Sequence, residues 1–251
     1  MSEQQPDTNA APATQTPIIS IRNAGICYRP LRNLFNRKMK EVWALRNLNL
    51  DLYEGEKLGI LGRNGCGKST LTRLIAQIYA PDEGTITYHK KDIHVELLSL
   101  GIGFESNLSG RENAILSGML MGKSRKYMIS RLEKIREFSG LGDFFDLPVY
   151  SYSSGMAMRL GFSVAIETAP DILIVDEVLG VGDQVFMEKS SKALKGKFQG
   201  NRTVILISHS PHKIKELCTR AIWLERGAIL AEGDPGKVSD HYLQNVHLYA
   251  H

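Results

Sequence analysis

The chain of 251 residues is 43% hydrophobic and 23% charged, proportions that exclude a wholly disordered, collagen-like or membrane-spanning protein. Its 31 basic and 27 acidic residues leave a formal charge of only +4, which does not require a nucleic-acid partner. Three cysteines at unrelated spacings favour free thiols in a reducing compartment over a disulfide framework.

The N-terminal residues 1–17 are polar and rich in Pro, Ala and Thr, so we expect a disordered tail without a secretion signal. Ordered structure is expected to begin with a short strand at Ile18–Ile21. A basic stretch follows at Arg29–Lys40. It could approach anionic lipid headgroups or a pyrophosphate-linked glycan, or it could be an exposed, solvated loop, and the sequence leaves both interpretations open.

The next elements change from strand to helix periodicity. Alternating apolar and polar residues predict a half-buried strand over Leu48–Leu52, and the apolar segment Leu58–Leu61 predicts a second strand. Helical spacing takes over at Leu71–Ile78, and Pro81–Gly84 ends that helix. A strand, a glycine-rich turn and a helix in this order begin a parallel α/β unit.

The middle of the chain, about residues 105–169, is expected to be helical, with Gly140 as a C-terminal cap. One face of the helix before this glycine would be apolar and consist of Ile129, Leu132, Ile135 and Phe138. Apolar strands alternate with helices in the remainder. The strands are expected at Ile172–Val175, Val204–Ile207 and Ala221–Leu224, and the helices around Asp183–Phe198 and up to Cys218. The fold class is therefore α/β with a mostly parallel sheet, interrupted by a helical block.

The clearest motif lies between a predicted strand and a predicted helix and has the spacing of a P-loop. Its glycines let several backbone N–H groups point at phosphate oxygens. Lys68 would neutralise the β- and γ-phosphates, and the Ser69 hydroxyl would ligate Mg²⁺. We predict a nucleotide site formed by Gly62, Arg63, Asn64, Gly65, Cys66, Gly67, Lys68, Ser69 and Thr70.

Two carboxylates, Asp176 and Glu177, follow a run of four apolar residues. A buried strand here would place them at its carboxyl end, where α/β sheets bind ligands. Asp176 would hold the Mg²⁺ shell, and Glu177 could polarise a water for attack on the γ-phosphate. The alternative is that the pair only caps the following turn.

The segment Tyr152-Ser153-Ser154-Gly155-Met156 completes an ordered set of motifs. P-loop, Ser-x-Gly segment, Asp-Glu strand, Asp183 and His209 together resemble the ATP-binding subunits of ABC transporters. Within that family the chain resembles the branch that exports lipid-linked polysaccharides, including O-antigen, capsule and teichoic acids. The resemblance spans about residues 18–245, and its narrower part is carried by Gly103-Phe104, Leu108–Asn113, Tyr152–Leu160 and Asp176–Asp183.

This resemblance implies an ATPase domain over residues 18–245, with a P-loop NTPase (RecA-like) core, an antiparallel β portion and a helical subdomain at about 105–169. It implies a head-to-tail homodimer that binds two ATP molecules with Mg²⁺. Each ATP would lie between the P-loop of one subunit and Ser153 and Gly155 of the other. The partners would be a transmembrane permease and a lipid-linked polysaccharide at the cytoplasmic face of the cell membrane, and not a nucleic acid.

The resemblance also implies roles for single residues. His209 would reach the γ-phosphate, and Asp183 would contact the opposite subunit. Tyr28 would stack on adenine, with Trp43 as a competitor for that role. The family's glutamine between the P-loop region and the helical block is missing, because no Gln occurs between Gln77 and Gln184, and Glu105 could take its place.

Three rival functions stay open. The same ATPase could serve an importer or another exporter. A soluble ABC protein acting on DNA or ribosomes would usually have two ATPase units or a long coiled-coil insertion, and neither is present. A regulatory module without turnover is disfavoured by the complete set of catalytic residues, which are Lys68, Asp176, Glu177 and His209.

Overall fold

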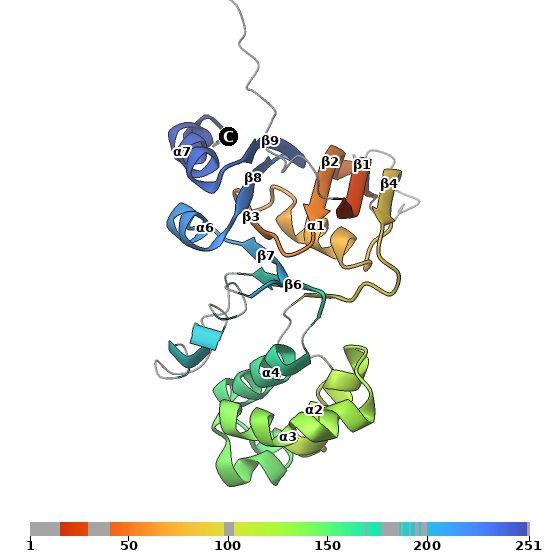
Figure 1. The fold of residues 1–251 in the computed structure, drawn as a ribbon, viewed down its shortest axis with the longest axis vertical. Helices are drawn as coiled ribbons and strands as arrows, with labels where there is room; N and C mark the ends of the chain where they lie inside the picture. Colours follow the sequence, from red (N-terminus) through yellow and green to blue (C-terminus); the bar gives the residue numbers. More distant parts are fainter. Residues whose placement is uncertain are drawn as a thin grey trace, which may run out of the picture.

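The computed structural model describes residues 16–29, 41–97, 103–168, 170–176 and 200–249, and a few positions between 186 and 196. Figure 1 shows two lobes: an α/β lobe that contains all the labelled strands, and a smaller lobe of three helices. Residues 1–15 of the tail predicted for residues 1–17, most of the basic stretch and most of the helix expected around Asp183–Phe198 lie outside the described residues. The end of the predicted tail is wrong, because Pro17 is the first residue of a strand.

An antiparallel sheet of three strands forms one layer of the α/β lobe. Its strands are β1 (Pro17–Tyr28), β2 (Val42–Tyr53) and β4 (Glu83–Tyr88), in the order β2-β1-β4. The strand expected at Ile18–Ile21 is therefore much too short. The pairing register with β2 shifts between Ile21 and Ala24, so the polar residues Arg22 and Asn23 lie in an irregular part of the ladder. Such a bulge lets pairing continue after the apolar pattern is interrupted.

The second sheet is mostly parallel, as predicted, in the order β5-β6-β7-β3-β8-β9. Only the pair β8–β9 is antiparallel among its described pairs. Strands β3, β7 and β8 are buried along their whole length, which explains their continuous apolar runs. The bounds are Lys57–Leu61 for β3, Val95–Leu97 for β5, Ile172–Asp176 for β6, Thr203–Ile207 for β7, Arg220–Glu225 for β8 and Ala228–Gly233 for β9.

Helices cover both faces of this second sheet. Helix α1 (Lys68–Ile75) packs Leu71 and Leu74 into a core that it shares with the antiparallel sheet. On the other face, α6 (Pro211–Leu217), α7 (Pro235–Asn245) and the 3₁₀ turn η3 (Val246–Tyr249) pack around a second core that includes Trp223. The helix that carries the phosphate loop is thus fixed between two sheets.

The helical lobe consists of α2 (Gly110–Leu120), α3 (Arg125–Ser139) and α4 (Ser154–Thr168), with 3₁₀ turns η1 (Gly142–Asp146) and η2 (Val149–Ser151). It has its own core around Met128, Leu132, Ile135 and Phe145. The expected apolar face of α3 is partly wrong. Ile129 is 44% exposed, and Met128 is buried instead, because spacings of four and three residues follow the helix better than repeated spacings of three. The Gly140 cap is confirmed by its positive φ of 62°.

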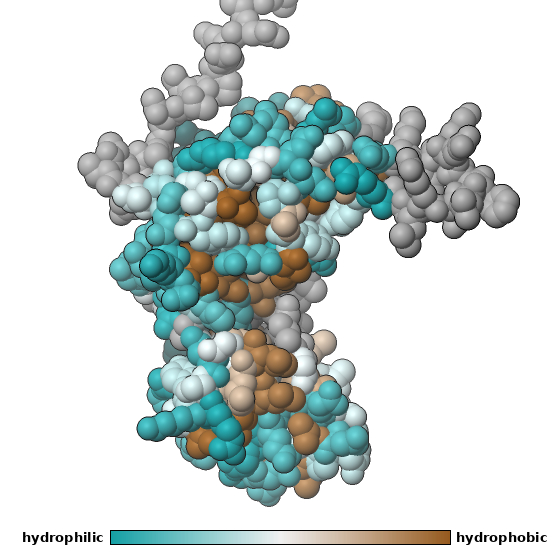
Figure 2. All heavy atoms as spheres, turned by 90° about the vertical axis from the view of Figure 1, so that its right-hand side faces the viewer, coloured by the Kyte–Doolittle hydropathy of each residue, from teal (hydrophilic) through white to brown (hydrophobic). Residues whose placement is uncertain are grey.

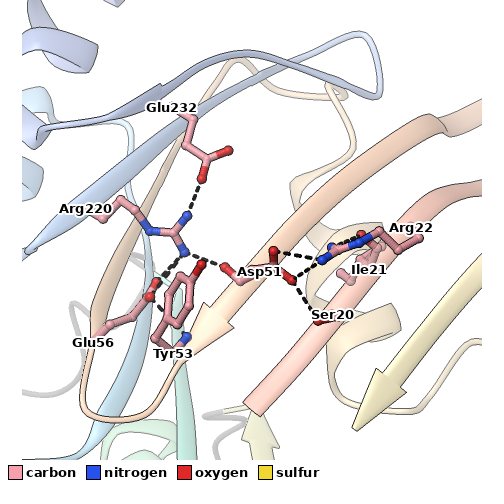
Figure 3. A network of polar contacts seen from close by, with 8 residues as sticks. All are labelled: Ser20, Ile21, Arg22, Asp51, Tyr53, Glu56, Arg220 and Glu232. Carbon is pink, nitrogen blue, oxygen red and sulfur yellow. Dashed lines mark hydrogen bonds and ion pairs between the residues drawn. The ribbon is translucent and has the colours of Figure 1, made fainter. Parts of the chain in front are cut away.

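An ion network centred on the buried pair of Arg220 and Glu56 joins the two sheets at the start of β3 (Figure 3). The Arg220 guanidinium lies 2.7 Å from the Glu56 carboxylate and also contacts Glu232 and the backbone carbonyl of Asp51. Asp51 in turn accepts hydrogen bonds from Ser20 at 2.7 Å and Arg22 at 2.9 Å, both on β1. These contacts fix the antiparallel sheet relative to β3, and therefore relative to the loop that follows β3.

None of the helices in the described part of the chain is both long enough and apolar enough to cross a membrane.

Candidate functional site

The loop Gly62–Ser69 connects β3 directly to α1, and its glycines are required by close backbone contacts. A side chain at Gly62 would come within 2.3 Å of the Leu224 carbonyl oxygen, and one at Gly67 within 2.6 Å of the Ala44 carbonyl oxygen. Gly67 also has a φ of 111°. By contrast, among the described residues other than its two chain neighbours, none has an atom within 4 Å of the position a side chain would take at Gly65. The loop is therefore packed against its own lobe on one side and open on the other.

Lys68 lies inside the curl of this loop. Its side chain is 8% exposed, and its ammonium donates hydrogen bonds of 2.7 Å to the carbonyls of Gly62 and Arg63. These partners are neutral, so they orient the ammonium without cancelling its charge. An anion that enters the loop would meet a fixed positive charge and the N-terminus of α1.

Cys66 contributes to the loop through its backbone. Its N–H donates to the Arg63 carbonyl at 3.3 Å, and its carbonyl accepts from the Gly227 N–H at 2.9 Å. The thiol itself is buried, and this burial raises the pKa of Cys66 above its ordinary value. Arg63 also donates to the Tyr249 carbonyl, which ties the loop to the C-terminal turn η3.

The strand register brings three predicted site segments to one edge of the parallel sheet. Ile60 of β3 pairs with Ile207 of β7, and Ile207 pairs with Asp176 of β6. The carboxyl ends of these strands therefore lie side by side, which is where parallel α/β sheets bind ligands. The exposed His209 follows β7 two residues after Ile207. The Asp176 side chain, Glu177 and Asp183 lie outside what the structure describes.

Tyr28, at the end of β1, contacts the helix of the phosphate loop. Its hydroxyl lies 3.2 Å from the Thr70 hydroxyl, and this hydrogen bond lowers the pKa of Tyr28. The ring is 44% exposed and meets Tyr79 edge-on at a centroid distance of 6.4 Å. The competitor Trp43 instead packs its ring over Gly25. Tyr28, the first of the two aromatic candidates, is thus in contact with the loop helix.

Ser153 is the N-cap of α4, in the helical lobe. Its hydroxyl oxygen accepts a hydrogen bond of 3.2 Å from the Met156 N–H, and its carbonyl accepts one of 3.0 Å from the Ala157 N–H. Ser153 and Ser154 are exposed, and the nearest atom to a side chain placed at Gly155 would be 3.9 Å away. The start of α4 thus offers a hydroxyl, free space and a helix N-terminus to a ligand from outside.

The two halves of the predicted ATP site are not brought together within one chain. The P-loop belongs to the α/β lobe and α4 to the helical lobe (Figure 1). The C-terminal end of α4 leads to β6, so its N-terminal end points away from that connection. Its 15 residues correspond to about 22 Å of helix.

One residue with a clear structural role was not predicted. Asn113 is completely buried, and its side chain holds both backbone groups of Glu105: it accepts from the N–H at 2.7 Å and donates to the carbonyl at 2.9 Å. The sequence did contain a local signal. Ser109 and Glu112 have the spacing of a capping box, which the structure forms at the start of α2.

The family model for ABC transporters matches residues 45–180, which is more than half of the chain. The chain belongs to the ABC transporter family. The P-loop lies inside the matched range, and so does Ser153 at the start of α4.

Two relatives carry more specific names. The O-antigen export system ATP-binding protein RfbB of Klebsiella pneumoniae is 37% identical over 87% of this chain and 88% of its own length. The teichoic acids export ATP-binding protein TagH of Enterococcus faecalis is 38% identical over 89% of this chain, but over 49% of its own length. The chain therefore spans about half the length of several relatives that it matches.

A solved structure confirms the fold. A dimeric ATP-binding cassette in a post-hydrolysis state, with ADP and phosphate bound, superimposes with a TM-score of 0.69 and covers 86% of this chain. At 21% sequence identity this similarity concerns the fold alone.

Proposed function

We propose that this ABC protein is the ATP-hydrolysing subunit of an exporter for lipid-linked surface polysaccharide, and that it works as a homodimer with a transmembrane permease at the cytoplasmic face of the membrane. The observation that carries this proposal is the division of the site. The P-loop is complete within one lobe, whereas Ser153 is exposed at the start of α4 in the other lobe, and the nearest described atom to a side chain placed at Gly155 would be 3.9 Å away. A second copy in head-to-tail orientation would complete both sites.

Each residue of the site would have its own role in the binding or hydrolysis of ATP. Lys68 would exchange its carbonyl partners for the phosphates, and the N–H groups of the loop would hold the phosphate oxygens. Tyr28 would stack on adenine from its position above Thr70. His209 would contact the γ-phosphate at the sheet edge, where Glu177 would orient the attacking water.

The residues present also fit Mg²⁺. Ser69 is exposed in the first turn of α1, which follows β3, and Asp176 ends β6, which is separated from β3 by β7 alone and ends at the same sheet edge. Hydroxyl and carboxylate oxygens are the ligands that this hard cation prefers. When bound, Mg²⁺ would neutralise charge on the phosphate oxygens.

The class of substrate is supported by the names of the two relatives, both of which are export ATP-binding proteins for surface polymers. O-antigen-like polysaccharide is our first choice, because the RfbB relative matches over 88% of its length. Teichoic acid, capsule or another substrate of an ABC transporter is the alternative. Both interpretations share the same ATPase chemistry.

Mixing two inactive variants tests the shared site directly. Lys68→Ala damages only the half of the site that the P-loop provides. Ser153→Ala damages only the half that the start of α4 provides. In a mixture, half of the pairs contain one copy of each variant, and such a pair has one intact site. We expect recovery to about a quarter of the wild-type rate of phosphate release. If both variants are folded and the mixture stays inactive, the site does not require two copies.

Export is tested separately in cells. A deletion strain complemented with wild type should display surface glycan, whereas a strain with Glu177→Gln should retain lipid-linked glycan inside. Unchanged surface glycan in the deletion strain, with no redundant exporter, would remove polysaccharide as the substrate and leave the ATPase proposal intact.

A further inference from the structure

The segment Gly110–Asn113 opens α2 and holds the loop before it in place. The Asn113 side-chain oxygen accepts from the Glu105 N–H, and its NH2 group shares two hydrogens among three carbonyls, those of Glu105 at 2.9 Å, Leu108 at 3.0 Å and Ser109 at 3.0 Å. Because Asn113 is completely buried, loss of these bonds would leave polar backbone groups unpaired in the interior. One side chain therefore determines the shape of the loop 105–109.

The loop 105–109 is joined by backbone hydrogen bonds to the segment that leads into α4. The Val149 N–H donates to the Leu108 carbonyl at 2.9 Å, and the Tyr150 N–H donates to the Ser106 carbonyl at 2.9 Å. In the other direction, the Gly110 N–H donates to the Leu147 carbonyl at 3.2 Å. Backbone bonds of this kind do not depend on flexible side chains, so the two segments behave as one unit.

Tyr152, directly before Ser153, closes this unit. Its hydroxyl donates a hydrogen bond of 2.6 Å to the Phe144 carbonyl. A side-chain carbon at Gly110 would lie only 2.2 Å from the same hydroxyl oxygen, so the space for the tyrosine exists because residue 110 is glycine. The neighbouring Arg111 pairs with Asp146 at 2.6 Å and places its guanidinium over the Phe145 ring. Gly110 and Tyr152 are thus complementary in shape.

We infer that Gly110, Asn113 and Tyr152 form a loop clamp that sets the position of Ser153 relative to the loop carrying Glu105. These three are positioning residues, which act on ATP hydrolysis through Ser153. The inference rests on the proposed function, in which Ser153 contacts the ATP held by the partner subunit. A displacement of the loop at Glu105 would then move the start of α4 with it, and would change how well the two subunits close on ATP.

Tyr152→Phe tests the clamp with the loss of a single oxygen. The matched control is Tyr127→Phe, which removes a similar bond in the same lobe, from the Tyr127 hydroxyl to the Glu167 carbonyl at 2.9 Å. Each variant is combined with Glu177→Gln, and ATP-driven dimerisation is followed by analytical ultracentrifugation. We expect Tyr152→Phe to weaken dimerisation about tenfold and Tyr127→Phe to leave it within about twofold. Binding of a fluorescent ATP analogue to the dilute chain, which reports on the P-loop alone, should be unchanged in both.

Two further variants distinguish loss of the clamp from a general loss of folding. Asn113→Asp keeps the acceptor for the Glu105 N–H but loses the donors to three carbonyls, so its dimerisation should weaken while its P-loop still binds the analogue. Gly110→Ala should also weaken dimerisation, and adding Tyr152→Phe should restore part of the loss, because the phenylalanine lacks the oxygen that the new methyl group meets.

The outcomes separate the two proposals. If the chain with only Glu177→Gln does not dimerise with ATP, the proposed function is wrong and the clamp loses its basis. If it dimerises, but Tyr152→Phe and Asn113→Asp behave like the Tyr127→Phe control, the function stands and the clamp is wrong. Additive losses in the Gly110→Ala and Tyr152→Phe pair, with no rescue, would likewise contradict the complementarity on which the clamp depends.

Discussion

The P-loop and the start of α4 are both glycine-containing helix starts that we assign to the same ATP, yet they are built in opposite ways. At Gly67 a side chain would collide with the backbone of the same lobe at 2.6 Å, whereas at Gly155 the nearest atom would be 3.9 Å away. Gly67 is thus required by its own chain, and Gly155 lies in free space. This difference indicates that the space at Gly155 is available for contact with another molecule.

The helices that begin near these two glycines are also packed differently. Helix α1 lies between two sheets and shares a large core with both. Helix α4 packs Leu160 and Val164 into the core of the helical lobe, and Phe162 and Ile166 into the second core of the α/β lobe. Brown, apolar surface is visible on the helical lobe in Figure 2. Met119, Leu120, Phe144, Leu147 and Tyr150 are among its exposed apolar residues. Apolar surface is visible on both lobes in Figure 2, so the contrast lies in the helices themselves: α1 is enclosed between two sheets, whereas Ser153 at the start of α4 is exposed.

The largest effect is expected from Lys68→Met, which removes the fixed charge of the P-loop. We expect the ATPase rate to fall about a thousandfold, which corresponds to about 4 kcal/mol. The control is Lys57→Met at the opposite end of β3, where the ammonium also donates to two backbone carbonyls, at 2.7 and 2.6 Å. That variant should lose stability and retain most activity. Equal loss of activity in both would show that the lysine at the P-loop has no special role.

Arg220→Met tests the packing that supports the P-loop lobe. Burial raises the pKa of Glu56, and Arg220 opposes that shift, so the variant leaves a buried carboxylate without its partner. We expect the free energy of unfolding to fall by about 3 kcal/mol, measured by urea denaturation. Lys215→Met removes an exposed ion pair with Asp240 and should cost less than about 1 kcal/mol. Similar losses in the two variants would contradict the importance of the buried network.

Substitution of Gly67 and of Gly155 by alanine tests the difference between the two helix starts directly. Gly67→Ala should lower both thermal stability and ATP binding, because the methyl group meets the chain's own backbone. Gly155→Ala should leave stability unchanged or raise it by up to about 1 kcal/mol, since alanine favours helix. Its ATPase rate should nevertheless fall about a hundredfold, because the methyl group occupies space intended for the partner's nucleotide. Full activity of Gly155→Ala would place the nucleotide elsewhere.

The smallest effect concerns Glu96, on β5, where the two lobes meet. Burial raises the pKa of Glu96 to about 7, although a hydrogen bond from Thr168 at the end of α4 and the charge of Lys123 oppose the shift. Between its ordinary pKa and about 7 the folded state binds more protons than the unfolded state, so stability falls as the pH rises through this range.

Glu96→Gln removes this titration. The stability of the variant relative to wild type should therefore rise by about 2 kcal/mol between pH 5 and pH 8. Urea denaturation at the two pH values measures this change. Glu133→Gln, at an exposed position of α3, controls for the loss of a charge. A constant difference between wild type and Glu96→Gln over this pH range would contradict the assignment.

Features that depend on short stretches of chain can be predicted from the residues of those stretches alone. The P-loop, the helix cap at Gly140 and the parallel strands are fixed by spacing and by the conformations that neighbouring residues allow. The order of these motifs was sufficient to indicate the family, because each motif carries its chemistry in a few adjacent residues.

The tertiary structure decided what depends on contacts between distant segments. The length of β1 follows from its pairing with β2, and the exposure of Ile129 follows from which face of α3 the lobe covers. Neither Asn113 nor Arg220 has a role that local spacing predicts, because Asn113 acts on backbone groups up to eight residues away and Arg220 on residues more than 160 positions away. Such contacts are chosen by packing, which no short stretch of sequence contains.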